Sequence, residues 1–247
     1  MNALLHSFKD LLNAGLAFVY PEVCQICGAA RATPDESFLC AGCRASVHFI
    51  TAPFCERCGL PFEGAITTSF ECSNCREQDW AFSKARSAVI ARDQMLEIIH
   101  RYKYQHALWF EPFLAGLLIE RARSEIVPGR WDWIVPVPLH PTKQREREFN
   151  QAERLAWRLS LATNVPLNAH LLRRVVPTRT QTLLSREERR SNVRNAFIAR
   201  DVASAEKKRI VLVDDVFTTG ATTGACAQAL VSAGASEVCV WTVARGI

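Results

Sequence analysis

Eight of the ten cysteines in the sequence occur as four pairs, each with two residues between its cysteines. This spacing turns both thiolates of a pair toward one ion, and Zn²⁺ binds four such ligands in a tetrahedron. The pairs are Cys24/Cys27, Cys40/Cys43, Cys55/Cys58 and Cys72/Cys75. They predict structural zinc, about two ions per chain. An iron–sulfur cluster or redox-active dithiols are the alternatives.

The grouping of these pairs into sites has two solutions. Sequential pairing leaves 12 residues between the first two pairs and 13 between the last two, which are the lengths of a hairpin between two knuckles. An interleaved arrangement would use the same residues differently. In either case a closed Cys₄ site is structural, so the zinc alone indicates no reaction.

A second set of reactive side chains follows the apolar run Ile210–Val213. Asp214 and Asp215 are adjacent carboxylates at the end of a predicted buried strand, and the loop Thr218–Thr222 adds three hydroxyls and a glycine before a predicted helix. Backbone amides in such a loop bind phosphate. Two carboxylates beside a phosphate require a ligand with hydroxyl donors, and a ribose 5-phosphate meets both demands. The alternative is a strand–turn–helix with incidental acids, and no Walker A loop is present.

A basic segment follows the predicted strand Trp131–Val137. Lys143, Arg145 and Arg147 occupy every second position there, and residues 143–194 carry one Lys and eleven Arg against five Glu. Arginine binds phosphate and diphosphate groups by bidentate hydrogen bonds. The cluster therefore indicates a basic segment over an anion site, whereas any one of these arginines could instead be a solvated surface charge.

The acidic strand and its loop resemble the signature of type I phosphoribosyltransferases, which bind 5-phosphoribosyl-1-pyrophosphate (PRPP). The resemblance implies that Asp214 and Asp215 hold the ribose hydroxyls and that Mg²⁺ accompanies PRPP. It also implies three further sets of contacts. The 5-phosphate loop is Thr218, Thr219, Gly220, Ala221 and Thr222. The pyrophosphate loop is Pro138, Leu139 and His140. The candidate contacts from a mobile loop are Lys143, Arg145 and Arg147.

The combination of zinc ribbon and PRPP signature resembles the ComF family of bacterial competence-related proteins, of the ComFC and GntX types. The segments His100–Tyr104, Val135–Pro141 and Phe149–Gln151 are also similar, whereas Glu148 stands where the family pattern has glycine. The resemblance implies a cytoplasmic protein that takes part in the uptake or use of external DNA, together with other DNA-uptake proteins. It further implies phosphoribosyltransferase chemistry on an unassigned acceptor.

Three functions remain open at this stage. The first is a PRPP-binding protein of DNA uptake, with or without transfer. The second is a non-enzymatic regulator that senses PRPP and binds nucleic acid, and the third is a nucleobase salvage phosphoribosyltransferase, for which a zinc module is unnecessary.

Single-stranded DNA is a candidate partner, because the ribbons carry three arginines expected to be exposed, Arg44, Arg57 and Arg76. Phe54 and Phe62 lie between these arginines and could stack on bases or form the ribbon core.

The elements that position these residues follow from hydrophobic periodicity. After residue 80 strands and helices alternate, which predicts an α/β fold of the type I phosphoribosyltransferase class, with a mostly parallel sheet flanked by helices and an N-terminal double zinc ribbon. The predicted divisions are an amphipathic helix at 1–20, the double ribbon at 21–80 and the phosphoribosyltransferase-type domain at 81–247. Lys9 and Asp10 interrupt the first apolar stripe, which argues against a signal peptide. No run reaches the ~18 apolar residues of a membrane span.

Overall fold

The computed structural model describes residues 22–64, 70–176 and 196–247. The predicted helix at 1–20 and part of the Arg-rich segment lie outside these residues. By its own contacts the chain divides into two compact units, one ending at Val47 and one beginning at His48. The predicted boundary at residue 80 stays a prediction, because compactness in space is a different criterion from a family boundary.

The smaller unit is organised around its two cysteine knuckles. The amide of Gly28 donates to the Cys24 carbonyl at 2.9 Å, and the amide of Arg44 donates to the Cys40 carbonyl at 3.0 Å. The second knuckle leads into the short helix α2 (Ala41–Ala45). These turns direct the four thiols toward one another, and three of the four cysteines are buried whereas Cys27 is exposed. The cysteine cluster takes the place of a larger apolar core.

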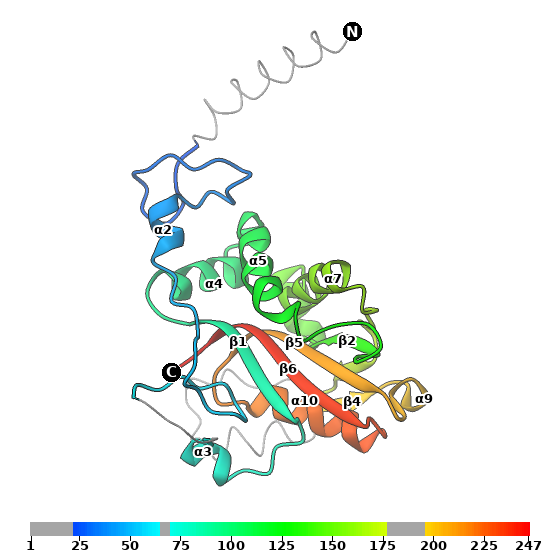
Figure 1. Ribbon diagram of the computed structural model, residues 1–247. Helices are drawn as coiled ribbons and strands as arrows, with labels where there is room; N and C mark the ends of the chain where they lie inside the picture. Colours follow the sequence, from blue (N-terminus) through cyan, green and yellow to red (C-terminus); the bar gives the residue numbers. More distant parts are fainter. Residues whose placement is uncertain (1–21, 65–69, 177–195) are drawn as a thin grey trace. The chain divides into compact units, whose positions relative to one another are not determined.

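The larger unit contains a four-stranded parallel sheet in the order β1-β6-β5-β2 (Figure 1). Its strands are β1 (Lys84–Ile90), β2 (Trp133–Pro136), β5 (Arg209–Phe217) and β6 (Glu237–Arg245). Residues 210–213 of β5 and 238–244 of β6 are buried and almost all apolar, as expected for central strands that are covered on both faces.

Helices cover both faces of this sheet (Figure 1). One face is covered by α5 (Glu111–Ala122) and α7 (Gln151–Thr163), and α4 (Gln94–Tyr104) and the short η1 (Leu108–Phe110) precede α5. The other face is covered by α10 (Ala221–Ser232), and the antiparallel pair β3 (Leu172–Arg174) and β4 (Phe197–Ala199) packs on α10. The remaining short helices of the larger unit are α3 (Ser73–Arg76), α6 (Pro141–Arg147) and α9 (Val202–Ala205).

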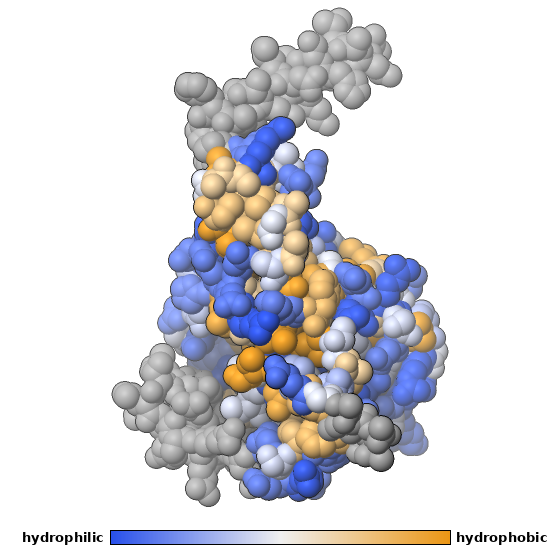
Figure 2. All heavy atoms as spheres, turned by 60° about the vertical axis from the view of Figure 1, so that its left-hand side comes forward, coloured by the Kyte–Doolittle hydropathy of each residue, from blue (hydrophilic) through white to orange (hydrophobic). Residues whose placement is uncertain are grey.

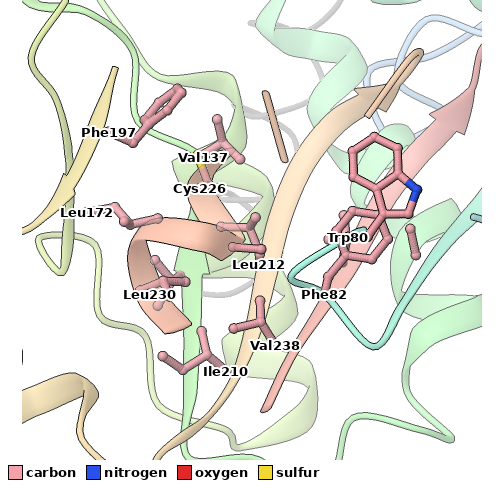
Figure 3. Close-up of a cluster of buried hydrophobic side chains, with 14 of the residues drawn as sticks. Trp80, Phe82, Val137, Leu172, Phe197, Ile210, Leu212, Cys226, Leu230 and Val238 are labelled. Atoms are coloured by element: carbon pink, nitrogen blue, oxygen red, sulfur yellow. The ribbon is translucent and has the colours of Figure 1, made fainter. Parts of the chain in front are cut away.

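The core on the α10 face includes the second cysteine cluster. Figure 3 shows Leu172 and Phe197 beyond α10, and Trp80 and Phe82 beside β5. The four sulfur-bearing side chains from Cys55 to Cys75 belong to the same buried cluster as these residues. The second ribbon therefore shares the hydrophobic core of the larger unit.

The predicted fold class is confirmed: strands and helices alternate after residue 80, and the four-stranded sheet is parallel. Asp93 and Asn150 immediately precede α4 and α7, and each helix buries one apolar face. Two differences concern the site. Strand β5 continues through Asp214 and Asp215 to Phe217, and the basic residues after the second strand form a helix, α6.

Among the described residues, no helix combines the length and apolar character that crossing a bilayer requires. On the face shown in Figure 2, apolar side chains are interspersed with hydrophilic ones.

Candidate functional site

The eight paired cysteines form two clusters, Cys24/Cys27/Cys40/Cys43 and Cys55/Cys58/Cys72/Cys75. Sequential pairing is therefore correct. A tetrahedron with Zn–S bonds of about 2.3 Å has S–S edges of about 3.8 Å. The Sγ separations that face each other across the clusters are close to this value: Cys24–Cys43 3.7 Å, Cys27–Cys40 3.9 Å and Cys58–Cys72 3.7 Å. Both clusters thus fit structural Zn²⁺, with all four positions taken by the protein.

The arginines of the ribbons differ from the prediction that all three are exposed. Only Arg76 is exposed; Arg44 and Arg57 are half-buried. Arg44 Nε donates to the Leu39 carbonyl at 3.1 Å, and Arg57 Nη2 donates to the Trp80 carbonyl at 2.7 Å. These two guanidinium groups are engaged in holding backbone carbonyls of the ribbons.

The two phenylalanines of the second ribbon are half-buried. Phe62 packs edge-on against Phe70 at 4.4 Å between ring centroids, and the Arg86 guanidinium lies 4.9 Å from the Phe54 ring. These contacts favour the ribbon-core interpretation over base stacking.

A cavity of about 960 Å³ opens at the carboxyl ends of β2 and β5. Ligands of open parallel sheets bind at this edge. The acidic pair, Thr218 and Thr222 line it on one side, and residues of α4 and α6 line it elsewhere. Thr219, Gly220 and Ala221 of the predicted phosphate loop are not among its lining residues.

The acidic pair is held by charge and by burial. Asp215 is buried, and its Oδ2 lies 2.9 Å from Lys103 Nζ of α4. Asp214 Oδ1 accepts a hydrogen bond from the Asp215 amide at 2.9 Å. Burial and the adjacent charge of Asp215 raise the pKa of Asp214 to about 8. Burial lowers the pKa of Lys103, but the two carboxylates outweigh it and the net direction is upward, so this lysine stays charged.

The phosphate loop turns sharply because of one glycine. Gly220 has φ 80°, in the left-handed region, and a Cβ there would lie 2.7 Å from the Phe217 ring and 2.9 Å from the Trp80 ring. Helix α10 begins at the next residue, Ala221, and its N-cap Gly220 supplies no side-chain cap, so amides of the first turn after Ala221 can serve a ligand. Thr219 Oγ1 instead accepts from the Ala221 amide at 3.4 Å, which keeps the loop closed.

The predicted pyrophosphate loop is divided in the structure. Pro138 and Leu139 line the cavity, whereas His140 caps α6 by accepting from the Thr142 amide at 3.3 Å. Asn150 Nδ2 donates to the Val137 carbonyl at 3.1 Å and so fixes the start of this loop to the start of α7.

The basic residues after this loop lie on a helix, so their spacing selects two of the three. Lys143 and Arg147 are four residues apart on α6 and line the cavity, whereas Arg145 is exposed and does not. Arg147 is buried, with its guanidinium 4.6 Å from the Tyr104 ring. The Arg-rich segment beyond residue 176 lies outside the described residues until 196.

The lining residues that were not assigned to the site from the sequence include Glu97, Lys103, Gln151 and Arg174. Gln151 is buried, and its Oε1 atom has no hydrogen-bond partner among the described residues. Burial lowers the pKa of Arg174, which lies on β3 close to Asp214. The similarity of the His100–Tyr104 and Phe149–Gln151 segments to the ComF pattern is the signal that could have indicated Lys103 and Gln151.

Glu148, which replaces a glycine of the family pattern, ends α6 with φ 62°. This left-handed conformation explains why glycine suits the position. The Glu148 side chain is exposed, and its carboxylate lies 3.5 Å from His106 Nδ1.

A parallel α/β sheet with an acidic pair and a hydroxyl-rich loop at its carboxyl edge, attached to two Cys₄ clusters, defines a class: zinc-ribbon proteins with a phosphoribosyltransferase-type fold. Residues 15–78 match the Double zinc ribbon domain family. Competence protein F of Haemophilus influenzae is 32% identical over 84% of this chain and 90% of its own. Competence protein ComFC of Bacillus subtilis is 31% identical over 86% and 85%. The chain belongs to the ComF family.

Further similarities are more distant or partial. DNA utilization protein YhgH of Escherichia coli (strain K12) is 28% identical over 93% of both chains. Among solved structures, the glutamine phosphoribosylpyrophosphate amidotransferase from B. subtilis is 25% identical over 53% of this chain, with a TM-score of 0.35. The similarity spans about a quarter of that enzyme's length. A purine phosphoribosyltransferase from Pyrococcus horikoshii is 18% identical over 56% of this chain and 83% of its own, with a TM-score of 0.34.

Proposed function

We propose that the cavity at the carboxyl edge of the sheet binds PRPP and that the protein acts as a phosphoribosyltransferase-type protein in the use of external DNA, in the cytoplasm. The carrying observation is that one cavity brings together an acidic pair, loop hydroxyls and four cationic side chains. PRPP has the matching groups: vicinal hydroxyls, a 5-phosphate and a diphosphate.

Each part of the ligand has a candidate partner. The hydroxyls of the ribose donate to Asp214 and Asp215, and the 5-phosphate accepts from Thr218, Thr222 and amides in the first turn of α10. The diphosphate binds along the loop Pro138–Leu139. Lys143 and Arg147 neutralise it from α6, and Lys103 pairs with Asp215 beside the anion.

Mg²⁺ fits this donor set, because the cavity supplies carboxylate oxygens from Asp214, Asp215 and Glu97 and the ligand supplies phosphate oxygens. When bound, the ion reduces the charge of the diphosphate as a leaving group. In transfer, a bond forms between the acceptor and ribose C1 as the C1–O bond breaks, and the diphosphate leaves with the electron pair. The residues of the cavity position the ligand and neutralise charge.

Calorimetry with PRPP, with and without Mg²⁺, tests the assignment. The double variant Asp214→Asn/Asp215→Asn should lose on the order of 1.5–3 kcal/mol of binding free energy per lost charged contact. Asp132→Asn is the matched control, because Asp132 pairs with Arg209 at the opposite, amino end of β5. Unchanged PRPP affinity in the double variant would refute the site.

A turnover assay then separates the possible activities. Diphosphate release that depends on single-stranded DNA supports transfer in DNA use, whereas release that depends on a free nucleobase supports salvage. PRPP binding without turnover supports a sensing regulator. The names of the relatives, competence and DNA utilization proteins, favour the first outcome.

Single-stranded DNA and other DNA-uptake proteins are the proposed partners. Contacts of arginine with phosphate make affinity depend on salt, with a slope of ~0.7 per neutralised phosphate for single strands. Fluorescence anisotropy with labelled oligonucleotides at rising salt, with and without PRPP, measures this dependence. Absence of binding at low salt would leave the DNA contact to a partner protein.

A further inference from the structure

The second cysteine cluster and the phosphate loop meet at Arg245, the last residue of β6. Its Nη1 donates to the carbonyls of Phe217 at 3.1 Å and Thr218 at 2.7 Å, where β5 passes into the loop. Its Nη2 donates to Cys58 Sγ at 3.8 Å. One side chain thus joins a predicted zinc ligand to the first residues of the phosphate loop.

The charge of Arg245 points to the same connection. The residue is only 4% exposed, and its guanidinium lies 4.8 Å from the Phe217 ring. Among the described residues no carboxylate pairs with it. A buried charge without a counter-charge is strongly destabilising. Four thiolates around one Zn²⁺ carry a net charge of about −2, so the loaded second cluster is the counter-ion that this guanidinium requires.

A second contact joins the same knuckle to the loop. Arg57 lies within the knuckle and donates to the Trp80 carbonyl at 2.7 Å. The Trp80 ring packs so closely on the start of α10 that a Cβ would lie 2.9 Å from it at Gly220 and 2.7 Å from it at Gly224. Trp80 also stacks on Phe82, beside β5 (Figure 3). The knuckle therefore supports the loop in two ways. Trp80 packs against the loop, and Arg245 holds the carbonyls of Phe217 and Thr218.

We propose that the second cysteine cluster positions the phosphate loop through Arg245, so that zinc occupancy of this cluster sets the affinity for PRPP. The inference rests on the proposed PRPP function for its ligand, but not for the coupling itself. Arg245 is a positioning residue, since it holds the backbone of the loop and does not line the cavity.

The first experiment measures the loop without a ligand. In Arg245→Lys the charge is kept and the planar fork is lost, so hydrogen exchange of the amides of residues 218–224 should become faster. Arg209→Lys is the matched control, because Arg209 also donates to a backbone carbonyl but lies at the amino end of β5. Equal exchange in Arg245→Lys and wild type would overturn the proposal. Arg245→Met, which also removes the charge, should accelerate exchange further.

The second experiment uses PRPP and zinc. PRPP affinity of Arg245→Lys should fall on the order of tenfold. Because coupling between sites is reciprocal, PRPP should also raise the affinity of one of the two zinc ions in equilibrium competition with a chelator. Cys24→Ser, in the other unit, should leave PRPP affinity unchanged. If wild type binds no PRPP, the proposed function fails while the exchange experiment still tests the coupling. If wild type binds and Arg245→Lys binds equally well, the positioning role is refuted.

Discussion

Replacement of Lys103 by methionine removes the ammonium group that pairs with the buried carboxylate of Asp215. Lys103 Nζ and Asp215 Oδ2 are 2.9 Å apart, and their side chains are 19% and 4% exposed. Breaking a buried ion pair by removing one partner costs about 3–5 kcal/mol, because the other charge stays buried and uncompensated. Water reaches part of the lysine, so we expect about 3 kcal/mol, the lower end of that range.

The double-mutant cycle with Asp215→Asn isolates this interaction. Lys103→Met/Asp215→Asn should recover most of the loss, since neither charge is then left alone. The assay is urea unfolding of the zinc-loaded protein, monitored by fluorescence. The half-exposed pair Lys84–Glu125 is the matched control, for which the cycle should give less than about 1 kcal/mol. A coupling energy for Lys103 and Asp215 as small as that of the control would refute the reasoning.

Three further outcomes are expected. Elemental analysis should give about two Zn²⁺ per chain, and zinc near zero in anaerobically purified protein would contradict the zinc assignment. Cys58→Ser should destabilise the larger unit, whereas Cys24→Ser should leave the unfolding of that unit unchanged. Because the pKa of Asp214 is raised from 3.8 to about 8, the native state keeps a proton that the unfolded chain has lost between these values. The free energy of unfolding should therefore decrease as pH rises through this window, and urea titrations from pH 6 to 9 should show a flatter decrease in Asp214→Asn. Glu148→Gly should raise the free energy of unfolding by about 0.5–1 kcal/mol, because relief of the left-handed conformation exceeds the added chain entropy of glycine; equal stability of Glu148→Ala and Glu148→Gly would argue against strain.

The spacing of neighbouring residues was enough to predict the cysteine knuckles and the acidic pair from the sequence. Two residues between cysteines are enough to form a knuckle, and an apolar run that ends in Asp214 and Asp215 defines a strand with acids at its carboxyl end. The interpretation of Lys143, Arg145 and Arg147 as an alternating mobile segment was incomplete for a local reason. Pro at the first turn and a capping histidine make this stretch a helix, so residues four apart share the cavity face.

Long-range contacts could not be read in this way. Lys103 is one of several cations on its helix, and only the packing of α4 near the end of β5 shows that it meets Asp215. Arg245 ends a strand, where a charged residue usually faces solvent. Its contact with Cys58 joins residues 187 positions apart, and no local pattern predicts such a pairing. The prediction that Arg44 and Arg57 are exposed was wrong, because the ribbon turns bring backbone carbonyls within hydrogen-bond distance of both side chains.

The two cysteine clusters, similar in sequence, have different structural consequences. The second shares the hydrophobic core with the strands that carry the acidic pair, so its loss affects the packing around the cavity. The first lies in a compact unit of its own that ends at Val47. The zinc of the first cluster is therefore not expected to stabilise the core that carries the cavity. We therefore expect Cys24→Ser to weaken any binding of single-stranded DNA or uptake proteins while PRPP affinity is kept. Equal loss of both would show that the two units act as one.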